Sequence, residues 1–308
     1  MQKLKYLISA TQFADRELLE NLFASAAEME RHDSERTLRL SLSGRILATI
    51  FYEPSTRTRL SFEAAMQKLG GGILTAENAR ENSSAAKGES IADAIRVIGG
   101  YADVIVMRHF EEGAAKAAAQ ISPVPLINAG DGAGEHPTQA LVDIYTIMKE
   151  LGGVEGRRIA LVGDLLYGRT IHSLLQLLCL YPGVSIDLIS PKNLRLPAKY
   201  IDYLKQNNVD FRESDTLEES IRHADVLYIT RVQRERFAVV SEYESIKDSY
   251  FVDEEIAARL KPEAVILHAL PRLNEIDPAV DNNPRAAYFR QAKNGLYVRM
   301  ALLDHLLS

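Results

Sequence analysis

Short apolar and β-branched runs alternate with longer segments of helical periodicity along almost the whole chain. This alternation predicts parallel sheets built from β–α–β units. A first series predicts strands at 46–52, 72–77, 103–107 and 124–129, with helices near 57–69, 88–99 and 111–120. A second series predicts strands at 158–164, 184–190, 209–214, 226–230 and 264–270, again with helices between them.

The two series predict an α/β protein with two doubly wound parallel-sheet domains, joined by interdomain helices. A helix from about Pro137 to Leu151 separates the series, with proline in its first turn and Gly152-Gly153 after its end, as is typical of helix termini. A further helix is expected at about 286–307. We therefore expect a first domain at residues 1–136, completed by a C-terminal helix at 288–308, and a second domain at 152–287.

Composition and charge limit the partners. The 308 residues carry a formal net charge of −6, which argues against a general nucleic-acid or membrane-surface role, so clustered arginines must form a local site suited to small anions. The single Cys179 lies in the apolar run LLQLLCLY, which favours a buried packing role over a nucleophile. No segment resembles a signal peptide or reaches membrane-spanning length, so we expect a cytoplasmic protein.

Polar residues follow the predicted strands, where ligands bind in open parallel sheets. In the first series these residues are Ser55, Thr56, Arg57, Thr58, Arg108, His109, His136 and Gln139. In the second series they are Arg169, Arg231, Gln233 and Arg272. Because the carboxyl ends of parallel strands share one edge, cations and amides are expected to converge on one rim.

The stretch STRTRLSFE, from Ser55 to Glu63, is the strongest single signal. Backbone N–H groups at a helix N-terminus, together with hydroxyl groups and a guanidinium, form a cradle for phosphate. Helix capping by Ser55 or Thr56 is the alternative, and it explains the hydroxyls. It does not explain Arg57 and Arg59, because a cation at a helix start is unfavourable without an anion. We favour the phosphate site.

Other signals are weaker when taken alone. The segment NSSAAKGES at 82–90 predicts a mobile loop that delivers Lys87 to a ligand, with a solvated loop as the alternative. His136 before Pro137 favours a hydrogen-bond donor to a polarised carbonyl over a capping residue. No metal is expected, because no cluster has metal-ligand spacing. No nucleotide cofactor is expected either, because both the G-x-G-x-x-G and Walker A patterns are absent.

The motifs together resemble those of aspartate carbamoyltransferase catalytic chains, in order and spacing, over essentially the full length. They are STRTRLSFE, SSxxKGES, VMRH, HPTQAL, GDLxYGRTxHSL, RVQxER and HxLPRxxEI. The first, third and fourth are shared with ornithine carbamoyltransferases, whereas GRTxHSL and RVQxER distinguish the aspartate enzymes. The resemblance implies transfer of a carbamoyl group from carbamoyl phosphate to L-aspartate in pyrimidine biosynthesis. Transfer to another amine such as ornithine, and an anion-binding module without turnover, are the alternatives.

The resemblance also implies a role for each matched residue. The phosphate of carbamoyl phosphate is held by Ser55, Thr56, Arg57, Thr58 and Arg108. Thr58, Arg108 and His136 donate to the carbonyl oxygen, and Gln139 and the backbone carbonyl of Leu270 hold the carbamoyl amide. Arg169 binds the α-carboxylate of aspartate, and Arg231 with Gln233 binds the β-carboxylate.

The remaining implied roles concern assembly and closure. Ser83 and Lys87 come from the neighbouring subunit, so the enzyme is a homotrimer with shared active sites, and separate regulatory chains are a further partner that the resemblance allows. Ser83 joins the residues that bind carbamoyl phosphate, and Lys87 joins the catalytic set and also contacts aspartate. Glu53 pairs with Arg169 and Arg236 when the domains close, the alternative being a plain surface ion pair.

Overall fold

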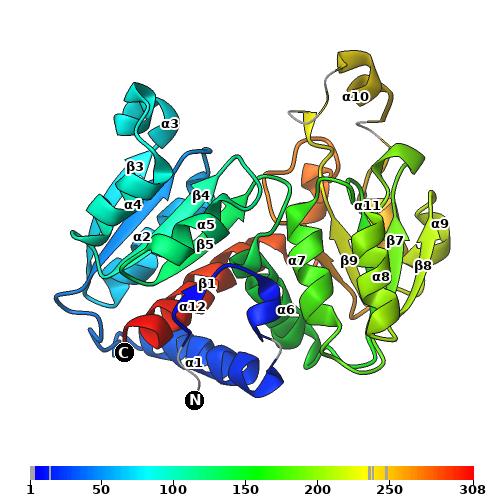
Figure 1. Ribbon diagram of the computed structural model, residues 1–308. Helices are drawn as coiled ribbons and strands as arrows, with labels where there is room; N and C mark the ends of the chain where they lie inside the picture. The colour runs from blue at the N-terminus through cyan, green and yellow to red at the C-terminus, as the bar shows by residue number, and fades with distance from the viewer. Residues whose placement is uncertain (1–3, 14, 235–236, 238, 247–248) are drawn as a thin grey trace. The chain divides into compact units, whose positions relative to one another are not determined.

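The computed structural model describes residues 4–13, 15–234, 237, 239–246 and 249–308. The chain divides into two compact units, unit 1 at Met1–Val142 with Lys293–Ser308 and unit 2 at Asp143–Ala292 (Figure 1). Each unit contains a five-stranded parallel sheet with helices, so the predicted fold class is confirmed. In the described part of the chain no helix combines the length and the apolar character that crossing a membrane requires.

The sheet of unit 1 has the strand order β1-β5-β4-β2-β3. Its strands are β1 (Tyr6–Leu7), β2 (Ile46–Phe51), β3 (Gly72–Glu77), β4 (Val104–His109) and β5 (Leu126–Asp131). Its helices are η1 (Ala10–Phe13), α1 (Arg16–Ser34), α2 (Thr56–Lys68), α3 (Ala79–Asn82), η2 (Ser84–Lys87), α4 (Ile91–Gly99) and α5 (Ala114–Ile121). Helices α6 (Pro137–Leu151) and α12 (Tyr288–Leu307) have residues in both units.

The alternation of side chains along β2 and β4 explains the two buried faces of this sheet. Ala48 and Ile50 of β2 pack with Ile105 and Met107 of β4 in one core cluster, against α4 and the alanine face of α5. Helix α2 buries Phe62, together with Ala65 and Met66. Two buried faces leave the strand ends as the edges at which a ligand can approach.

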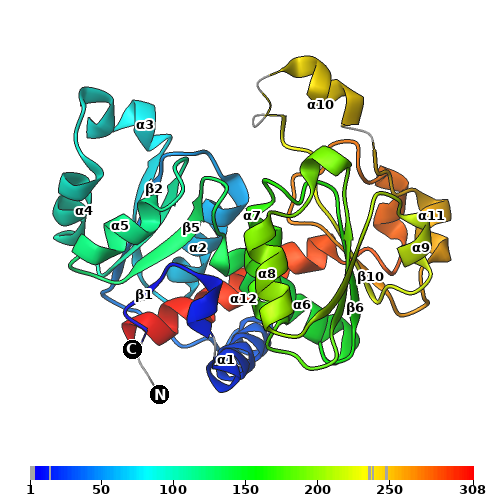
Figure 2. The ribbon, with the colours of Figure 1, turned by 45° about the vertical axis from the view of Figure 1, so that its right-hand side comes forward.

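The sheet of unit 2 has the strand order β10-β9-β6-β7-β8. Its strands are β6 (Arg158–Val162), β7 (Ser185–Ile189), β8 (Asp210–Ser214), β9 (Val226–Ile229) and β10 (Val265–Leu267). Its helices are α7 (Arg169–Leu178), η3 (Lys192–Leu194), α8 (Ala198–Gln206), α9 (Glu218–Ile221), α10 (Val240–Ile246), α11 (Glu254–Arg259) and η5 (Pro278–Asn282). Figure 2 shows α7 and α8 on one side of this sheet and α9 and α11 on the other.

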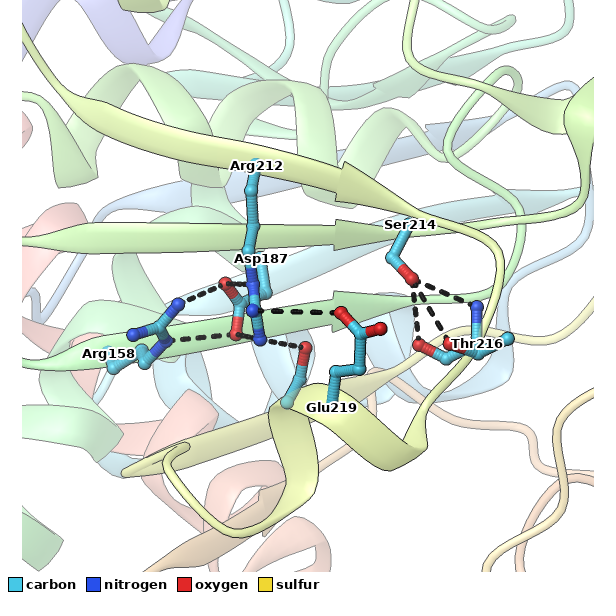
Figure 3. A network of polar contacts seen from close by, with 7 residues as sticks. Arg158, Asp187, Arg212, Ser214, Thr216 and Glu219 are labelled. Atoms are coloured by element: carbon cyan, nitrogen blue, oxygen red, sulfur yellow. Dashed lines mark hydrogen bonds and ion pairs between the residues drawn. The ribbon is translucent and has the colours of Figure 1, made fainter.

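An ion-pair cluster around one buried carboxylate ties the edge strand β8 to the centre of this sheet (Figure 3). Asp187 of β7 is 1% exposed and accepts hydrogen bonds from Arg158 of β6 at 2.9 Å and Arg212 of β8 at 2.6 Å. Arg212 also donates to Ser220 of α9 at 3.0 Å. Burial acts to raise the pKa of Asp187, but the bonds from the two arginines outweigh burial and hold the pKa below its ordinary value.

One segment predicted as a loop contains short helical turns. The segment 82–90, expected to be a mobile loop, contains the end of α3 and the whole of η2. Ser83 causes the difference, because its hydroxyl donates to the carbonyl of Ala79 at 2.5 Å and accepts from the N–H of Ala85 at 3.1 Å. These bonds cap and start a short 3-10 turn that ends at Lys87. Helix α1 and strand β1 lie outside the predicted elements.

Candidate active site

Each sheet has one point at which its strand order reverses. In unit 1 the chain runs from β2 to β3 on one side and then returns to β4 on the other side of β2. In unit 2 it runs from β6 through β7 to β8 and then returns to β9 on the other side of β6. Ligands of parallel α/β sheets bind at the carboxyl ends of strands at such points. The ends of β2 and β4, and those of β6 and β9, are therefore the candidate sites.

The predicted phosphate cradle lies at the reversal point of unit 1. Helix α2 begins at Thr56, with Ser55 at the N-cap in an extended conformation, φ −158° and ψ 92°. The Ser55 side chain makes no capping hydrogen bond, so capping does not account for it. Thr58 is buried, whereas Thr56 and Arg57 are exposed. The first-turn N–H groups of α2 and these side chains are the donors that an anion needs.

Arg59 is not part of this cradle. Its guanidinium donates to Glu63 at 3.1 Å and to Glu77 at 2.8 Å, and its side chain is only 15% exposed. The protein's own carboxylates therefore neutralise this cation, and the inference that Arg59 requires a bound anion is wrong. Arg57, the other arginine in the first turn of α2, is exposed.

Arg108 lies beside the cradle because β2 and β4 are neighbours, with Phe51 and Arg108 in register. The carbonyl of Arg108 accepts from the N–H of Tyr52 at 2.9 Å, and its guanidinium donates to the carboxylate of Glu53 and to the carbonyl of Ala129. The Arg108 side chain is 12% exposed. An anion that binds Arg108 must therefore share or displace a carboxylate already present.

The pairing of Glu53 with Arg169 and Arg236 stays a prediction. Arg236 lies outside the described residues. Arg169 belongs to unit 2, and Glu53 belongs to unit 1, where it accepts a hydrogen bond from Arg108.

His136 and Gln139 are positioned by the start of α6. The His136 side chain is 4% exposed, and its carbonyl accepts from the N–H groups of Gln139 at 3.0 Å and Ala140 at 3.3 Å. His136 thus occupies the capping position with its backbone, while its ring contacts Thr138, with 3.4 Å between Nδ1 and Oγ1. Capping by the backbone leaves the predicted donor role of the ring open.

Hydrogen bonds to Asp131 and Glu135 anchor the two ends of the loop before His136. Asp131 accepts from the N–H of Gly113 at 2.9 Å, which joins the loop to the start of α5. Glu135 accepts from the hydroxyl of Ser9 at 2.7 Å and the N–H of Ala10 at 2.8 Å, which joins it to the N-terminal segment. These anchors hold the residue that precedes His136.

In unit 2 the loop between β6 and α7 presents Arg169 as the first residue of α7. Gly168 is required there, because a Cβ atom at this position would lie 2.4 Å from the carbonyl oxygen of Asp164. Gln233, which follows β9, donates its amide to the carbonyl of Tyr167 at 3.0 Å. The structure therefore brings Gln233 to the loop that carries Arg169, and Arg231 follows β9 two residues before Gln233.

Asp164 is a candidate that the sequence prediction does not include. It is fully buried, and its Oδ1 accepts from the N–H of Tyr167 at 2.9 Å, while Oδ2 has no hydrogen-bond partner among the described residues. Burial raises the pKa of Asp164 to about 6, although backbone N–H groups, including that of Gln233, and the charge of Arg231 oppose the rise. A perturbed acid between two predicted ligand residues is typical of functional sites. Its place as a polar residue at the end of the predicted apolar strand 158–164 is the signal in the sequence.

The other predicted residues are placed as follows. Leu270 lies after β10 with a positive φ of 56°, and the Leu270–Pro271 bond is cis. Ser83 forms the local bonds of η2, and Lys87 at its end is exposed. The contribution of Ser83 and Lys87 to a neighbouring subunit stays a prediction. Within the described ranges, His, Cys, Asp and Glu side chains do not form groups of three that could hold a metal ion.

These arrangements define an α/β protein that presents fixed guanidinium, hydroxyl and amide groups at the reversal point of each of its sheets. Comparison with known families agrees. The carbamoyl-P binding domain of aspartate/ornithine carbamoyltransferases matches residues 5–149, and their Asp/Orn binding domain matches residues 155–306. The chain belongs to the aspartate/ornithine carbamoyltransferase family.

The relatives within this family favour aspartate over ornithine as the acceptor. The chain is 52% identical to the chloroplastic aspartate carbamoyltransferase of Arabidopsis thaliana over 306 residues, which cover 99% of this chain and 78% of that protein. It is 51% identical to the aspartate carbamoyltransferase catalytic subunit of Methanocaldococcus jannaschii, with 99% and 98% covered.

Solved structures agree with the fold. The catalytic subunit of M. jannaschii aspartate transcarbamoylase has a TM-score of 0.90 and 49% identity, covering 99% of this chain and 98% of that one. Aspartate transcarbamoylase from Trypanosoma cruzi in complex with carbamoyl phosphate and aspartate has a TM-score of 0.94 and 40% identity, with 99% and 98% covered. The predicted family and enzyme class, a carbamoyltransferase, are confirmed.

Proposed function

We propose that this chain transfers the carbamoyl group of carbamoyl phosphate to the amine of L-aspartate, giving N-carbamoyl-L-aspartate and phosphate for pyrimidine biosynthesis. The observation that carries the proposal is the register of Arg108 of β4 with Phe51 of β2, which places Arg108 beside the strand end that leads into the hydroxyl-rich start of α2. This set of donors suits the phosphate group of an acyl phosphate. The relatives named above support aspartate as the acceptor.

In this proposal unit 1 supplies the donor site. The first turn of α2, from Ser55 to Thr58, holds the phosphate, and Arg108 bridges the phosphate and the carbonyl. Thr58, Arg108 and His136 donate to the carbonyl oxygen, on which negative charge grows as the amine attacks. A donor aimed at such an oxyanion contributes about 3 kcal/mol to the lowering of the barrier. Gln139 and the carbonyl of Leu270 orient the carbamoyl amide.

Unit 2 supplies the acceptor site. Arg169 binds the α-carboxylate, and Arg231 with Gln233 binds the β-carboxylate. The amine nitrogen of aspartate then forms a bond to the carbonyl carbon, the bond from that carbon to the phosphate oxygen breaks, and the amine proton passes to the departing phosphate. No covalent enzyme intermediate is required. Holding both substrates in attack geometry supplies about 7–11 kcal/mol.

Release of phosphate tests the proposal. Purified protein with carbamoyl phosphate and L-aspartate should release phosphate and yield N-carbamoyl-L-aspartate by mass spectrometry, whereas L-ornithine should give only the background rate. Ornithine carries a cationic side chain, which Arg231 repels. Faster turnover with ornithine than with aspartate, or none with either, contradicts the proposal.

A pair of arginine variants tests the acceptor site. Arg231→Ala should raise the KM for aspartate about 10-fold to 100-fold, because one charge-assisted hydrogen-bonding group contributes about 1.5–3 kcal/mol. Arg222→Ala, which removes an exposed arginine of the same unit, should leave that KM unchanged. Equal effects of the two changes show that Arg231 acts only through general charge.

We also propose a homotrimer in which Ser83 and Lys87 reach a neighbouring subunit. Arg108→Ala and Lys87→Ala chains should each be inactive alone. Chains of the two variants assembled together should regain activity, because some sites in the hybrid then contain both native residues. Absence of recovery in hybrids of trimeric mass contradicts sharing of the site. Separate regulatory chains are tested by comparing the mass of this assembly with that isolated from the native source.

For the compartment we propose the cytoplasm. The single Cys179 suits a reducing environment and packs as a half-buried side chain. The relative from Arabidopsis thaliana is named chloroplastic, so the proposal needs its own measurement. Fractionation of source cells with antibody against this chain should find it in the cytosolic fraction, and recovery from an organelle contradicts the proposal.

A further inference from the structure

The turn that carries Leu270 is built around one buried imidazole. His268 follows β10 and is 3% exposed. Its Nδ1 atom lies 2.7 Å from the backbone nitrogen of Leu270, and its Nε2 atom lies 2.7 Å from the carboxylate of Glu275. The N–H of Leu270 can only donate, so Nδ1 must accept and carries no proton. The ring proton is therefore on Nε2 and is donated to Glu275.

Glu275 completes the turn from its other end. It is 7% exposed and accepts from His268 through one oxygen and from the N–H of Leu273 through the other, at 3.0 Å. Burial acts to raise the pKa of Glu275, but the hydrogen bond from His268, together with the one from the N–H of Leu273, holds it below the ordinary value. The carboxylate therefore stays ionised, as a firm acceptor for the imidazole.

A chain of buried hydrogen bonds also fixes the backbone of His268. Its N–H donates to the amide oxygen of Gln291 at 2.9 Å, and Gln291 donates to Asp143 of α6 at 2.6 Å. Asp143 in turn accepts from the hydroxyl of Tyr228 at 2.9 Å. The side chains in this chain of bonds are all buried. A satisfied buried network of this kind holds a single arrangement.

Leu270 needs such support. Its φ of 56° lies in the left-handed region, which costs a residue with a Cβ atom about 1–2 kcal/mol. A strained backbone persists only where its surroundings hold it, and such positions gather at ligand sites. The acceptor on His268 is directed at the N–H of this same residue. The strain and its support thus meet at the residue whose carbonyl is proposed to receive the carbamoyl amide.

We propose that His268 is a positioning residue that gives the enzyme its selectivity for the carbamoyl amide. By holding the N–H of Leu270 it aims the Leu270 carbonyl at the NH2 group of carbamoyl phosphate, and Glu275 keeps the imidazole in the required tautomer. This inference rests on the proposed function, because it assumes the role of the Leu270 carbonyl. His268 itself does not touch the substrate.

Two substitutions of His268 test the roles of its two ring nitrogens separately. His268→Asn retains an acceptor close to the position of Nδ1, within reach of the N–H of Leu270, but does not reach Glu275. His268→Gln reaches Glu275 but leaves the N–H of Leu270 without its acceptor. His223→Gln, which changes an exposed histidine of the same unit, is the matched control. The double change His268→Asn with Glu275→Gln avoids an unpaired buried carboxylate.

Acetyl phosphate is the probe that isolates amide recognition. It has the phosphate and the carbonyl of carbamoyl phosphate but a methyl group in place of NH2, so it has no hydrogen to donate to Leu270. His268→Gln should weaken carbamoyl phosphate binding about 10-fold, the effect of one lost hydrogen bond, and leave acetyl phosphate binding unchanged. The His268→Asn double variant and the His223→Gln control should keep the wild-type ratio of the two affinities.

The outcomes are distinct. Equal weakening of both phosphates by His268→Gln, or no weakening of either, overturns the positioning role, since a turn that serves only stability has no preference for the amide. Failure of the wild-type protein to bind carbamoyl phosphate overturns the proposed function, and this inference with it.

A measurement on the unchanged protein covers the case in which His268→Gln does not fold. Nitrogen-15 NMR of labelled histidines should show His268 with a bare Nδ1 and a protonated Nε2. Carbamoyl phosphate should shift that Nδ1 resonance and acetyl phosphate should not. A protonated Nδ1, or equal shifts with both ligands, overturns the proposal.

Discussion

Replacing Asp187 by alanine should destabilise unit 2 by about 3 kcal/mol. Asp187 accepts four hydrogen bonds from Arg158 and Arg212, at 2.6–3.3 Å. Bonds of about 1.5–3 kcal/mol each would give a larger loss if nothing compensated. The two arginines are 33% and 37% exposed, however, so water recovers much of that loss. Removal of one partner from a buried pair costs about 3–5 kcal/mol, and the lower end applies because only the carboxylate is fully buried.

Hydrogen exchange is the suitable assay, because two units need not unfold in one transition. Peptides that cover β7 and β8 should lose about 3 kcal/mol of protection in Asp187→Ala and about half of that in Asp187→Asn, which keeps one acceptor oxygen. Asp202→Ala, a change of an exposed aspartate on α8, should leave the same peptides unchanged. A loss below about 1 kcal/mol in Asp187→Ala refutes the reasoning.

The stabilisation by the Asp187 carboxylate should decrease as the pH falls. The pKa of Asp187 is lower in the folded protein than its ordinary value, so the carboxylate's contribution is fully present above about pH 4 and is lost as the pH falls through the folded pKa. The difference in protection between the native protein and Asp187→Asn should therefore shrink in acid. A difference that stays constant from pH 7 to pH 3 contradicts the assigned charge.

Three further changes have defined outcomes. Glu53→Gln should lower the KM for carbamoyl phosphate about threefold, because a partly exposed ion pair no longer competes for Arg108; steady-state kinetics check this, and a higher KM contradicts it. Asp164→Asn should raise stability to denaturant at pH 8 by up to about 3 kcal/mol, because the folded carboxyl, with its pKa raised to about 6, is unfavourable when ionised. Since folding is then favoured by protonation, that advantage should disappear as the pH falls from 6 to 4. Burial raises the pKa of Cys179 to about 12, so iodoacetamide at pH 8 should modify it only after unfolding, as mass spectrometry can show.

A site formed by residues that are contiguous in the chain could be predicted from the sequence. The cradle at Ser55 to Thr58 depends on one helix start, and the hydroxyls, the arginine and the preceding apolar run are contiguous in the chain. The partner of Arg59 could not be predicted in the same way. Glu77 lies 18 residues away, on the strand that happens to pair with β2. An isolated cation in a sequence does not reveal which carboxylate the fold brings to it.

The roles of two acidic residues, Asp164 and Glu53, also depend on contacts between distant parts of the chain. In the sequence Asp164 is only the last, polar residue of the predicted strand 158–164, whereas its burial and raised pKa follow from the packing of the loops after β6 and β9. Glu53 and Arg108 are 55 residues apart and meet because β2 and β4 are adjacent in the sheet. Periodicity contains no information on strand order. The sequence therefore predicts neither the burial of Asp164 nor the pairing of Glu53 with Arg108.

The amino-acid sequence by itself determined the alternation of strands and helices, the parallel sheets and the kinds of side chain at their carboxyl edges, because these depend on period, turn chemistry and composition over short stretches. The tertiary structure alone decided which charges neutralise one another, which buried acid has a raised pKa and which imidazole supports Leu270. Those outcomes depend on strand order and burial, and both arise from contacts between residues far apart in the chain.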